Sequence, residues 1–345
     1  MTDTATATPL GTTGVWLAPL ALGAMILGTT TDIPTSYRLL DHVASELSGR
    51  LTAPDGSPAI AMVDTADCYC WWDRPDSRGG DSESLIGRWL AISGRRDDIF
   101  LATKGTGQVW GHEGIWNGAS TPDWNIARKQ FVGASAAVLR PALDSSLTRL
   151  GVDHIDLYYV HVDDLATPLE ETLETLASFV TAGKVRYLGW SNVSTDRLET
   201  IRALCEANGW PLPVAVQQQH SYLRPRPDAE SLSIVGAEQR AYLAAHPDQT
   251  LGAYSPILKG IYDDPARLAS HYLMEPYAGP EADARLAALT ATAADLGVKP
   301  NALVLAWLLA QRSPRVLPMI GPRTWEQYIA GLDALDIAVP ESLLD

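Results

Sequence analysis

The chain has 345 residues, of which 46% are hydrophobic and 19% charged, a composition typical of a globular protein with a full core. Its net charge of −15 argues against a nucleic-acid partner and against an anionic membrane surface. The N-terminal segment lacks the apolar stretch of a signal peptide, and the longest apolar run, residues 302–310, is too short to span a bilayer. We therefore expect a cytoplasmic protein, and its oligomeric state stays open.

Eight short apolar runs recur along the chain. Most are continuous rather than alternating, as expected for parallel strands that are buried on both faces. They lie near residues 20–25, 59–63, 99–103, 155–160, 185–190, 214–216, 250–253 and 316–320.

Segments with helical spacing lie between these runs. Residues 82–93, 134–150 and 167–182 each carry apolar side chains at the 3.6-residue period of an amphipathic helix. Gly151 and Gly183 follow two of these segments, where a helix commonly ends in a left-handed residue.

Strands that alternate with helices eight times predict a (β/α)8 TIM barrel, which fits one domain over residues 1–345. A doubly wound sheet is the alternative, but no G-x-G-x-x-G phosphate loop follows the first strand. Residues 105–130 and 256–280 are predicted long loops on the C-terminal face, where barrel enzymes carry their active sites.

Four polar residues stand at or just after the C-terminal ends of predicted strands: Asp64, Tyr69, Lys104 and His161. In a barrel these positions meet at one mouth. A Tyr with a pKa of about 10 becomes a useful proton donor if a neighbouring Lys ammonium lowers that pKa. An Asp can hold the Lys, and a His can orient a carbonyl oxygen. The set therefore predicts an acid for carbonyl reduction.

Each of these residues also has an ordinary structural interpretation. An Asp often caps a loop, a Lys often lies on the surface, a Tyr often packs, and a His often sits bonded in a core. Four such residues at matching strand ends favour a shared site. The chain has three cysteines, and Cys68 and Cys70 flank Tyr69 without further ligands at fitting spacing. We expect reduced thiols and no metal.

Three motifs occur in one order along the chain: D-T-A-x-x-Y at 64–69, A-T-K at 102–104, and S-L-x-R-L at 146–150 followed by His161. Together with the segment 10–14, similar to an opening β-hairpin, they resemble the aldo-keto reductase family up to about residue 335. The resemblance implies a barrel with an N-terminal hairpin. It also implies a nicotinamide cofactor, NADP or alternatively NAD, and hydride transfer to an aldehyde or ketone.

The same resemblance assigns cofactor contacts to strand ends and to the loops that follow them. A clamp from three strand ends would hold the carboxamide, a Tyr would stack on the nicotinamide, and a Ser-Pro loop would cradle the pyrophosphate. Arg323 favours NADP because it is a candidate partner for a 2′-phosphate. The implied cofactor residues are Gly23, Met25, Asp64, Ser191, Asn192, Gln217, Tyr254, Ser255, Pro256, Ile257, Leu258, Lys259, Gly260, Gly321, Arg323 and Gln327.

Ala330 and Gly331 occupy a site where many members carry Glu-Asn, a departure that weakens adenine recognition. Tyr69, His161, Trp72 and Trp110 are the predicted substrate contacts. Further Trp residues at 71, 116 and 124 suggest indole faces for a sugar or polyol carbonyl, with loop packing and a plain hydrophobic site as the alternatives.

The sequence thus predicts an NADP-dependent oxidoreductase that acts on a small-molecule carbonyl. Two other classes stay open. One is a reductase-like barrel that acts mainly as a cofactor-binding regulatory subunit. The other is a cofactor-free barrel hydrolase that uses Asp64 and His161, in which the implied cofactor residues would have no purpose.

Overall fold

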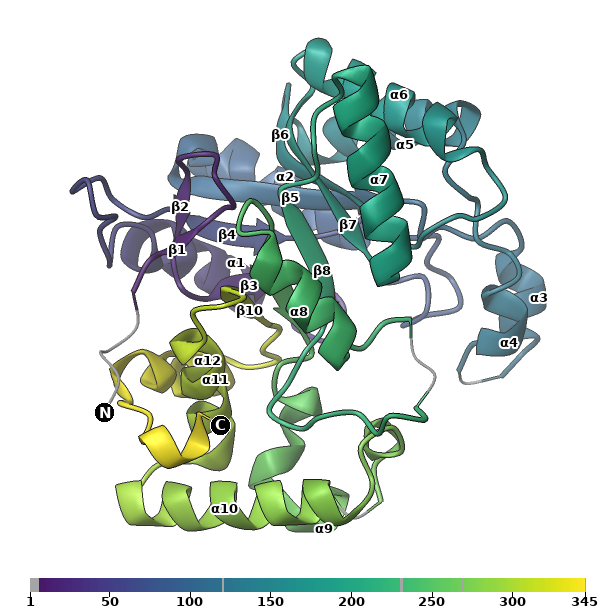
Figure 1. Ribbon diagram of the computed structural model, residues 1–345. Coiled ribbons are helices and arrows are strands. Elements are labelled where there is room, and N and C mark those ends of the chain that lie inside the picture. The colour runs from purple at the N-terminus through teal and green to yellow at the C-terminus, as the bar shows by residue number, and fades with distance from the viewer. Residues whose placement is uncertain (1–5, 120, 230–231, 269, 345) are drawn as a thin grey trace.

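The structure is a computed structural model and describes residues 6–119, 121–229, 232–268 and 270–344. Eight parallel strands close into a barrel in the order β10–β3–β4–β5–β6–β7–β8–β9 (Figure 1). Each predicted run overlaps one of them, so the barrel is confirmed and the open doubly wound sheet is excluded. The strands are β3 (Ala21–Gly23), β4 (Ala61–Asp64), β5 (Ile99–Gly105), β6 (Ile155–Val160), β7 (Val185–Ser191), β8 (Ala215–Gln219), β9 (Thr250–Tyr254) and β10 (Val316–Ile320).

Helices surround the barrel and lie between successive strands in the chain (Figure 1). The three predicted segments correspond to α2, α5 and α6. Gly151 ends α5 with φ 66°, and Gly183 follows α6 with φ 72°, as the glycine signals predicted. The outer helices are α1 (Ile33–His42), α2 (Asp81–Ser93), α5 (Ala136–Leu150), α6 (Leu169–Thr181), α7 (Thr195–Asn208), α8 (Ala237–Ala245), α10 (Pro280–Leu296), α11 (Pro300–Ala310) and α12 (Trp325–Leu332).

The two predicted long loops contain short helices, so their description as plain loops is wrong. Segment 105–130 carries α3 (His112–Trp116) and α4 (Trp124–Ala127), and segment 256–280 carries α9 (Pro265–Leu268). Asp123 starts α4 because its side chain accepts from two backbone N–H groups of the first turn. One position in each segment, 120 and 269, lies outside the described residues.

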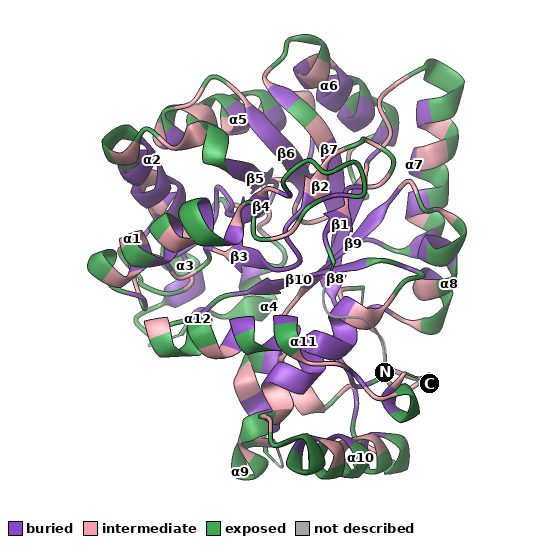
Figure 2. Ribbon diagram, turned by 90° about the vertical axis from the view of Figure 1, so that its left-hand side faces the viewer, coloured by how far each residue is buried: buried purple, intermediate pink, exposed green. Residues whose placement is uncertain are grey.

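The barrel interior follows the two-residue period of its strands. Inward-facing side chains such as Met62, Ala102, Tyr159 and Ala215 form one core, while their neighbours along each strand pack against the helices in a second core. Both faces of the strands are therefore buried, which explains the continuous apolar runs (Figure 2).

An N-terminal hairpin of β1 (Thr8–Pro9) and β2 (Trp16–Leu17) was predicted from the segment 10–14 and is present. It lies against the amino end of the barrel, since Gly11 N donates to the Thr250 hydroxyl at the start of β9 over 2.7 Å. Leu10 and Leu17 pack into the inner core and close that end. The open end is the opposite one, where the strands reach their carboxyl termini.

Helices α2 and α5 approach closely on the outside of β5. A Cβ added at Gly87 of α2 would meet the Arg149 carbonyl oxygen at 2.1 Å, so the contact requires glycine. Arg149 pairs with the buried carboxylate of Glu83 at 2.7 Å, and that carboxylate also accepts from the Thr103 hydroxyl at 2.6 Å. The Arg of the S-L-x-R-L motif thus fixes two helices to the strand that carries Lys104.

No single described helix is long and apolar enough to cross a membrane. Helices α10 and α11, which meet at a sharp bend, together reach the length and the apolar composition of a membrane span, and only these two criteria support that reading. Among the residues that the structure describes, no group of three or more His, Cys, Asp or Glu side chains is placed to hold a metal ion.

Candidate active site

The barrel brings the four predicted polar residues to its carboxyl end. Asp64 ends β4, Lys104 lies near the end of β5, and His161 follows β6 directly, on three adjacent strands. Two positions before each of them lies a side chain of the inner core: Met62, Ala102 and Tyr159. Because alternate residues of a strand face the same side, these three polar side chains also point toward the barrel axis. Tyr69 reaches the same place from the loop after β4.

The Lys104 ammonium is fully buried, and three acceptors satisfy it. It donates to Asp64 Oδ1, to the Thr65 carbonyl at 2.7 Å and to the Tyr69 hydroxyl oxygen at 2.7 Å. The second Asp64 oxygen accepts from Gln217 Nε2 at 2.9 Å. All three N–H groups of the ammonium and both oxygens of the carboxylate therefore have a partner, as a stable buried pair requires.

The expected lowering of the Tyr69 pKa is wrong for this protein. Burial, followed by the neighbouring Asp64 carboxylate, raises the pKa of Tyr69 well above its usual value. Asp64 faces the same ammonium and offsets its charge at the phenol. Tyr69 is therefore a phenol throughout the neutral range, with its oxygen held by Lys104.

His161 is held in place through both its backbone and its ring. Its backbone N–H donates to the Gly105 carbonyl at 2.9 Å, and its carbonyl accepts from Asn192 Nδ2 at 2.7 Å. The ring lies edge-to-face with Tyr69, with centroids 5.8 Å apart. Burial and then the Lys104 charge hold the pKa of His161 well below its usual value, so the ring is neutral at neutral pH.

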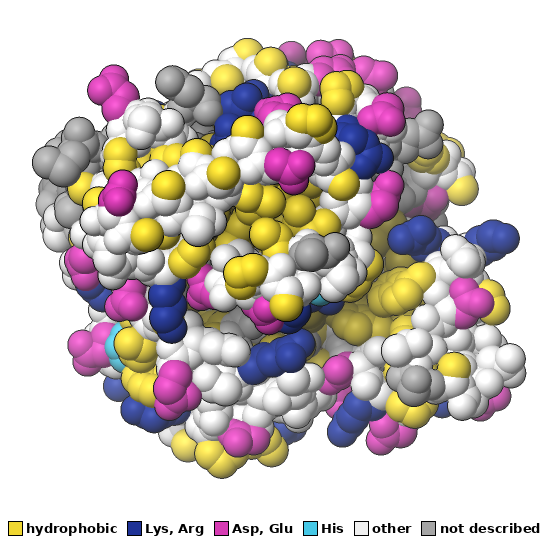
Figure 3. Space-filling model, turned by 90° about the horizontal axis from the view of Figure 1, so that it is seen from below, with side chains coloured by type: hydrophobic (Ala, Val, Ile, Leu, Met, Phe, Trp, Pro, Cys, Tyr) yellow, Lys and Arg dark blue, Asp and Glu magenta, His cyan; other side chains and the backbone are white. Residues whose placement is uncertain are grey.

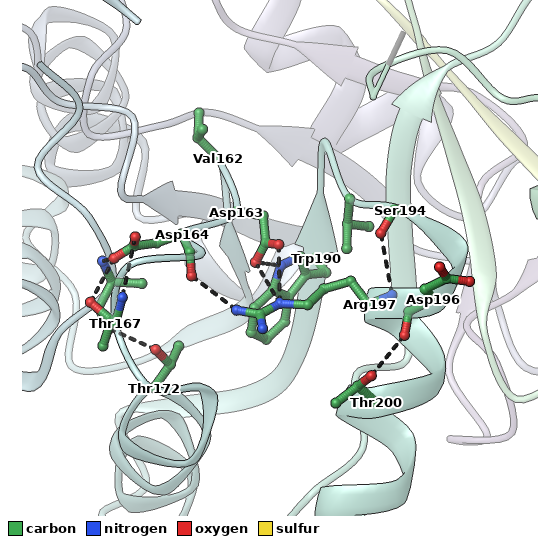
Figure 4. A network of polar contacts seen from close by, with 12 residues as sticks. Val162, Asp163, Asp164, Thr167, Thr172, Trp190, Ser194, Asp196, Arg197 and Thr200 are labelled. Atoms are coloured by element: carbon green, nitrogen blue, oxygen red, sulfur yellow. Dashed lines mark hydrogen bonds and ion pairs between the residues drawn. The ribbon is translucent and has the colours of Figure 1, made fainter. Parts of the chain in front are cut away.

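An ion-pair cluster fixes the chain just after His161 (Figure 4). Asp163 accepts from Trp190 Nε1 at 3.1 Å and pairs with Arg197 of α7 at 3.1 Å. Arg197 also donates to the Asp164 carbonyl at 2.9 Å. These contacts tie the loop after β6 to β7 and α7, so the backbone that carries His161 is held from both sides.

Asn192 connects three predicted site residues. Tyr254 donates its hydroxyl to Asn192 Oδ1 at 2.9 Å, and Asn192 Nδ2 donates to the His161 carbonyl and to Ser191 Oγ. The Asn192 backbone is left-handed, with φ 51°, which turns the chain sharply at the strand end. Gln217 lies beside Ser191 on the neighbouring strand β8, but its amide donates to Asp64 instead of to this group.

The predicted pyrophosphate loop, residues 255–260, is unusually rich in left-handed backbone. Ser255, Leu258, Lys259 and Gly260 have φ of 49°, 45°, 61° and 80°. Ile257, with φ −110°, is followed by left-handed Leu258, and such a right-to-left pair occurs in backbone concavities that bind anions. Within the loop, Leu258 N donates to the Ser255 carbonyl and Gly260 N to the Ile257 carbonyl.

The predicted adenosine end lies at the start of α12. Arg323 N donates to Gln327 Oε1 at 2.9 Å, and Thr324 caps the helix. The Arg323 side chain is exposed and makes no ion pair with any described residue. Across the barrel seam, Gly321 lies against the Gly23 carbonyl, and a Cβ at Gly321 would meet that oxygen at 3.4 Å. Met25, at the end of the same strand region, is 39% exposed.

The Trp residues of these loops differ in exposure and in their contacts. Trp72 contacts Tyr69 edge-to-face at 5.6 Å and also lies 6.2 Å from Trp124, which is 43% exposed. Trp71 and Trp116 are buried and joined by a hydrogen bond from Trp116 Nε1 to the Trp71 carbonyl, so they pack the loops together. Trp110 is 73% exposed and makes no ring-to-ring contact with any described residue.

Seen from below, a hollow floored by hydrophobic side chains separates the body of the molecule from a lobe at its right, where Figure 1 places α3 and α4 (Figure 3). The lobe that carries α3 and α4 thus borders an apolar recess.

Sequence reasoning missed two neighbours of the four polar residues. Cys68 Sγ lies 3.3 Å from His161 Nδ1. Asp67 is buried, and burial followed by the Glu83 charge raises its pKa to about 8. The only signal in the sequence was their place inside the D-T-A-x-x-Y motif, whose variable positions carry no pattern of their own.

Over most of its length, this chain is similar to several oxidoreductases. An uncharacterized oxidoreductase of Bacillus subtilis, YrpG, is 31% identical over 98% of this chain and 93% of its own length. An aldo-keto reductase of Schizosaccharomyces pombe, yakc [NADP(+)], is 31% identical over 81% and 78% of the two chains. A norsolorinic acid reductase of Emericella nidulans, stcV, is 29% identical over 95% and 76%.

Among solved structures, the thermostable aldo-keto reductase Tm1743, determined with the inhibitor epalrestat, covers 98% of this chain and 97% of its own, with a TM-score of 0.67. At 24% identity this likeness concerns the fold. The family model described as Aldo/keto reductase family matches residues 19–343. On that match and on the relatives that share its length, the chain belongs to the aldo/keto reductase family.

Proposed function

We propose that this oxidoreductase reduces an aldehyde or ketone to an alcohol with NADPH, and that Tyr69 is the general acid. The observation that carries the proposal is the hydrogen-bonded row from Asp64 through Lys104 to Tyr69, beside His161, at the carboxyl end of the barrel. The family supports carbonyl reduction in general terms.

The other strand-end residues fit a nicotinamide dinucleotide by the chemistry of their groups. The hydroxyl of Ser191 and the amide of Asn192 suit a carboxamide, the left-handed loop 255–260 suits a pyrophosphate, and the unpaired cation of Arg323 suits a 2′-phosphate. A relative whose name carries NADP(+) supports the choice of NADP over NAD. A reduced nicotinamide, when bound, supplies the hydride that a carbonyl carbon accepts.

The chain's own residues then manage the proton. Tyr69 holds it as a phenol and transfers it to the substrate oxygen. The phenolate that remains is stabilised by the Lys104 ammonium, which already donates to that oxygen. Asp64 keeps the ammonium in position, and neutral His161 donates a hydrogen bond that orients the carbonyl.

We propose a sugar or polyol carbonyl as the substrate class. Trp72 lies against the acid and Trp124 lies beside Trp72, so one aromatic wall extends from Tyr69 toward the surface. An indole face can cover the C–H side of a sugar ring, while polar groups bond its hydroxyls. A hydrophobic carbonyl compound is the competing occupant of the same wall.

Two measurements test the proposal. Titration of tryptophan fluorescence with NADPH and NADH should show binding, tighter for NADPH. A panel of aldoses, aliphatic aldehydes and aromatic ketones, followed through NADPH absorbance, should then identify turnover. Absence of cofactor binding would overturn the assignment, while tight binding without turnover on any carbonyl would favour the regulatory-subunit alternative.

A further inference from the structure

One contact of the site has no role in the chemistry described above: the thiol of Cys68 lies against the imidazole of His161. Sγ and Nδ1 are 3.3 Å apart, within hydrogen-bonding distance for sulfur. The contact is enclosed, because Cys68 is 1% exposed and a Cβ added at Gly107 would meet His161 Nδ1 at 2.6 Å and Cys68 Sγ at 2.8 Å. Glycine at position 107 therefore leaves room for this pair.

The direction of the hydrogen bond follows from the two groups. A thiol can donate its S–H, and sulfur is a weak acceptor, whereas an unprotonated imidazole nitrogen is a good acceptor. Burial raises the pKa of Cys68 well above its usual value, and burial lowers that of His161. Both groups are neutral at neutral pH. The Asp67 carboxyl also interacts with the thiol, but its raised pKa of about 8 keeps it largely protonated, and an imidazole nitrogen is the better acceptor. The favoured arrangement is therefore S–H donating to Nδ1.

A neutral imidazole carries one proton, so an Nδ1 that accepts leaves that proton on Nε2. Within the described part of the chain, the ring of His161 makes no other hydrogen bond. Its Nε2–H is therefore available to a ligand. The other tautomer would present a lone pair to a carbonyl oxygen, which repels it.

We propose that Cys68 is a positioning residue that holds His161 as the Nε2–H tautomer, so that His161 can donate to the substrate oxygen. The role of the tautomer in turnover rests on the proposed carbonyl reduction, while the tautomer itself does not. The competing account is that Cys68 only fills space beside the ring, in which case any side chain of similar volume would serve.

The two accounts are separated by nitrogen-15 NMR of histidine-labelled protein, with the His161 signals assigned through His161→Asn. Wild type should show His161 Nδ1 as an unprotonated nitrogen and Nε2 as a protonated one. Cys68→Ser keeps a donor and should keep that pattern. Cys68→Val keeps the volume without the donor and should shift the signals toward the other tautomer. Cys205→Val, at a buried cysteine of α7 remote from the ring, is the matched control and should change nothing.

Activity provides the second readout. Cys68→Val should lower kcat by roughly tenfold, the effect of one lost hydrogen bond, with NADPH affinity unchanged, and Cys68→Ser should restore most of it. A wild-type spectrum with a protonated Nδ1 would overturn the proposal, whether or not any variant folds. So would a folded Cys68→Val protein with the wild-type spectrum. A wild-type Nε2–H pattern in a protein that reduces no carbonyl would instead count against the proposed function alone.

Discussion

Replacing Lys104 with methionine removes the charge at the centre of the site and keeps most of the stem. The ammonium it removes is fully buried and donates to Asp64, Tyr69 and the Thr65 carbonyl. The variant leaves the Asp64 carboxylate buried, with the Gln217 amide as its remaining side-chain donor among the described residues. Breaking a buried ion pair by removing one partner costs about 3–5 kcal/mol, so the free energy of unfolding should fall by that amount.

A double variant separates charge from packing. Lys104→Met with Asp64→Asn leaves no unpaired carboxylate, so it should be more stable than Lys104→Met alone, with a coupling of about 1–3 kcal/mol. In both variants the turnover rate should be lower than that of the wild type by a factor on the order of 10²–10⁴, because the Tyr69 oxygen loses its cationic donor. Urea unfolding followed by circular dichroism measures the first effect, and NADPH oxidation at saturating cofactor measures the second.

The matched control is Lys184→Met. Lys184 pairs with Asp144 at 2.6 Å, but both side chains are largely exposed, at 43% and 60%. Such surface pairs contribute about 0–1 kcal/mol. If Lys104→Met is destabilised no more than this control, the buried pair does not anchor the site. If it folds, binds NADPH and keeps its turnover, the row from Asp64 to Tyr69 is not the proton-donating machinery.

Four further predictions concern separate parts of the site. Tyr69→Phe should lower turnover by on the order of 10²–10⁴ with little change in the NADPH dissociation constant, and a near wild-type rate would exclude Tyr69 as the acid. Arg323→Ala should weaken NADPH by about 1.5–3 kcal/mol and NADH little in fluorescence titrations; equal losses would place Arg323 away from the 2′-phosphate. Trp72→Ala should reduce kcat/KM by a factor that corresponds to about 1–3 kcal/mol of transition-state stabilisation, because the ring touches Tyr69. Trp110→Ala should change kcat/KM little because that side chain is exposed, and the reverse ranking would contradict the aromatic wall. Asp67, whose pKa is raised to about 8 in the folded protein from about 3.9 in a free chain, binds its proton more tightly when folded, so stability should fall as pH rises from about 4 to about 8. Asp67→Asn should flatten that slope in urea unfolding, and an unchanged slope would refute the assignment.

The barrel was predictable because its strands are buried on both faces. Continuous apolar runs marked all eight strands, and polar residues at the carboxyl ends of β4, β5 and β6 marked the site. Strand β8 is the instructive exception. Its apolar run stops at Val216, but the strand continues through Gln219, because Gln217, Gln218 and Gln219 bond to buried partners that no sequence pattern reveals.

The residues that form the site were easier to predict from the sequence than their pKa shifts. The sequence placed an Asp, a Lys and a Tyr together, but the sign of the Tyr69 pKa shift depends on burial and on how far the Asp64 charge offsets that of Lys104. The contact from Cys68 to His161 depends on a glycine 39 positions from the cysteine, Gly107, which no local periodicity links to either residue. The short helices α3 and α4 were hidden by a Gly-rich composition typical of loops.

The central claim is that hydride reaches a carbonyl carbon while Tyr69 supplies the proton. The most direct test uses NADPH deuterated at the transferable hydride position, with the best carbonyl substrate from the panel and mass spectrometry of the alcohol. The account predicts one deuterium in each molecule of alcohol made by the wild-type protein, and almost no labelled alcohol from Tyr69→Phe over the same time. Alcohol without deuterium, or equal yields of labelled alcohol from the two proteins, would contradict it.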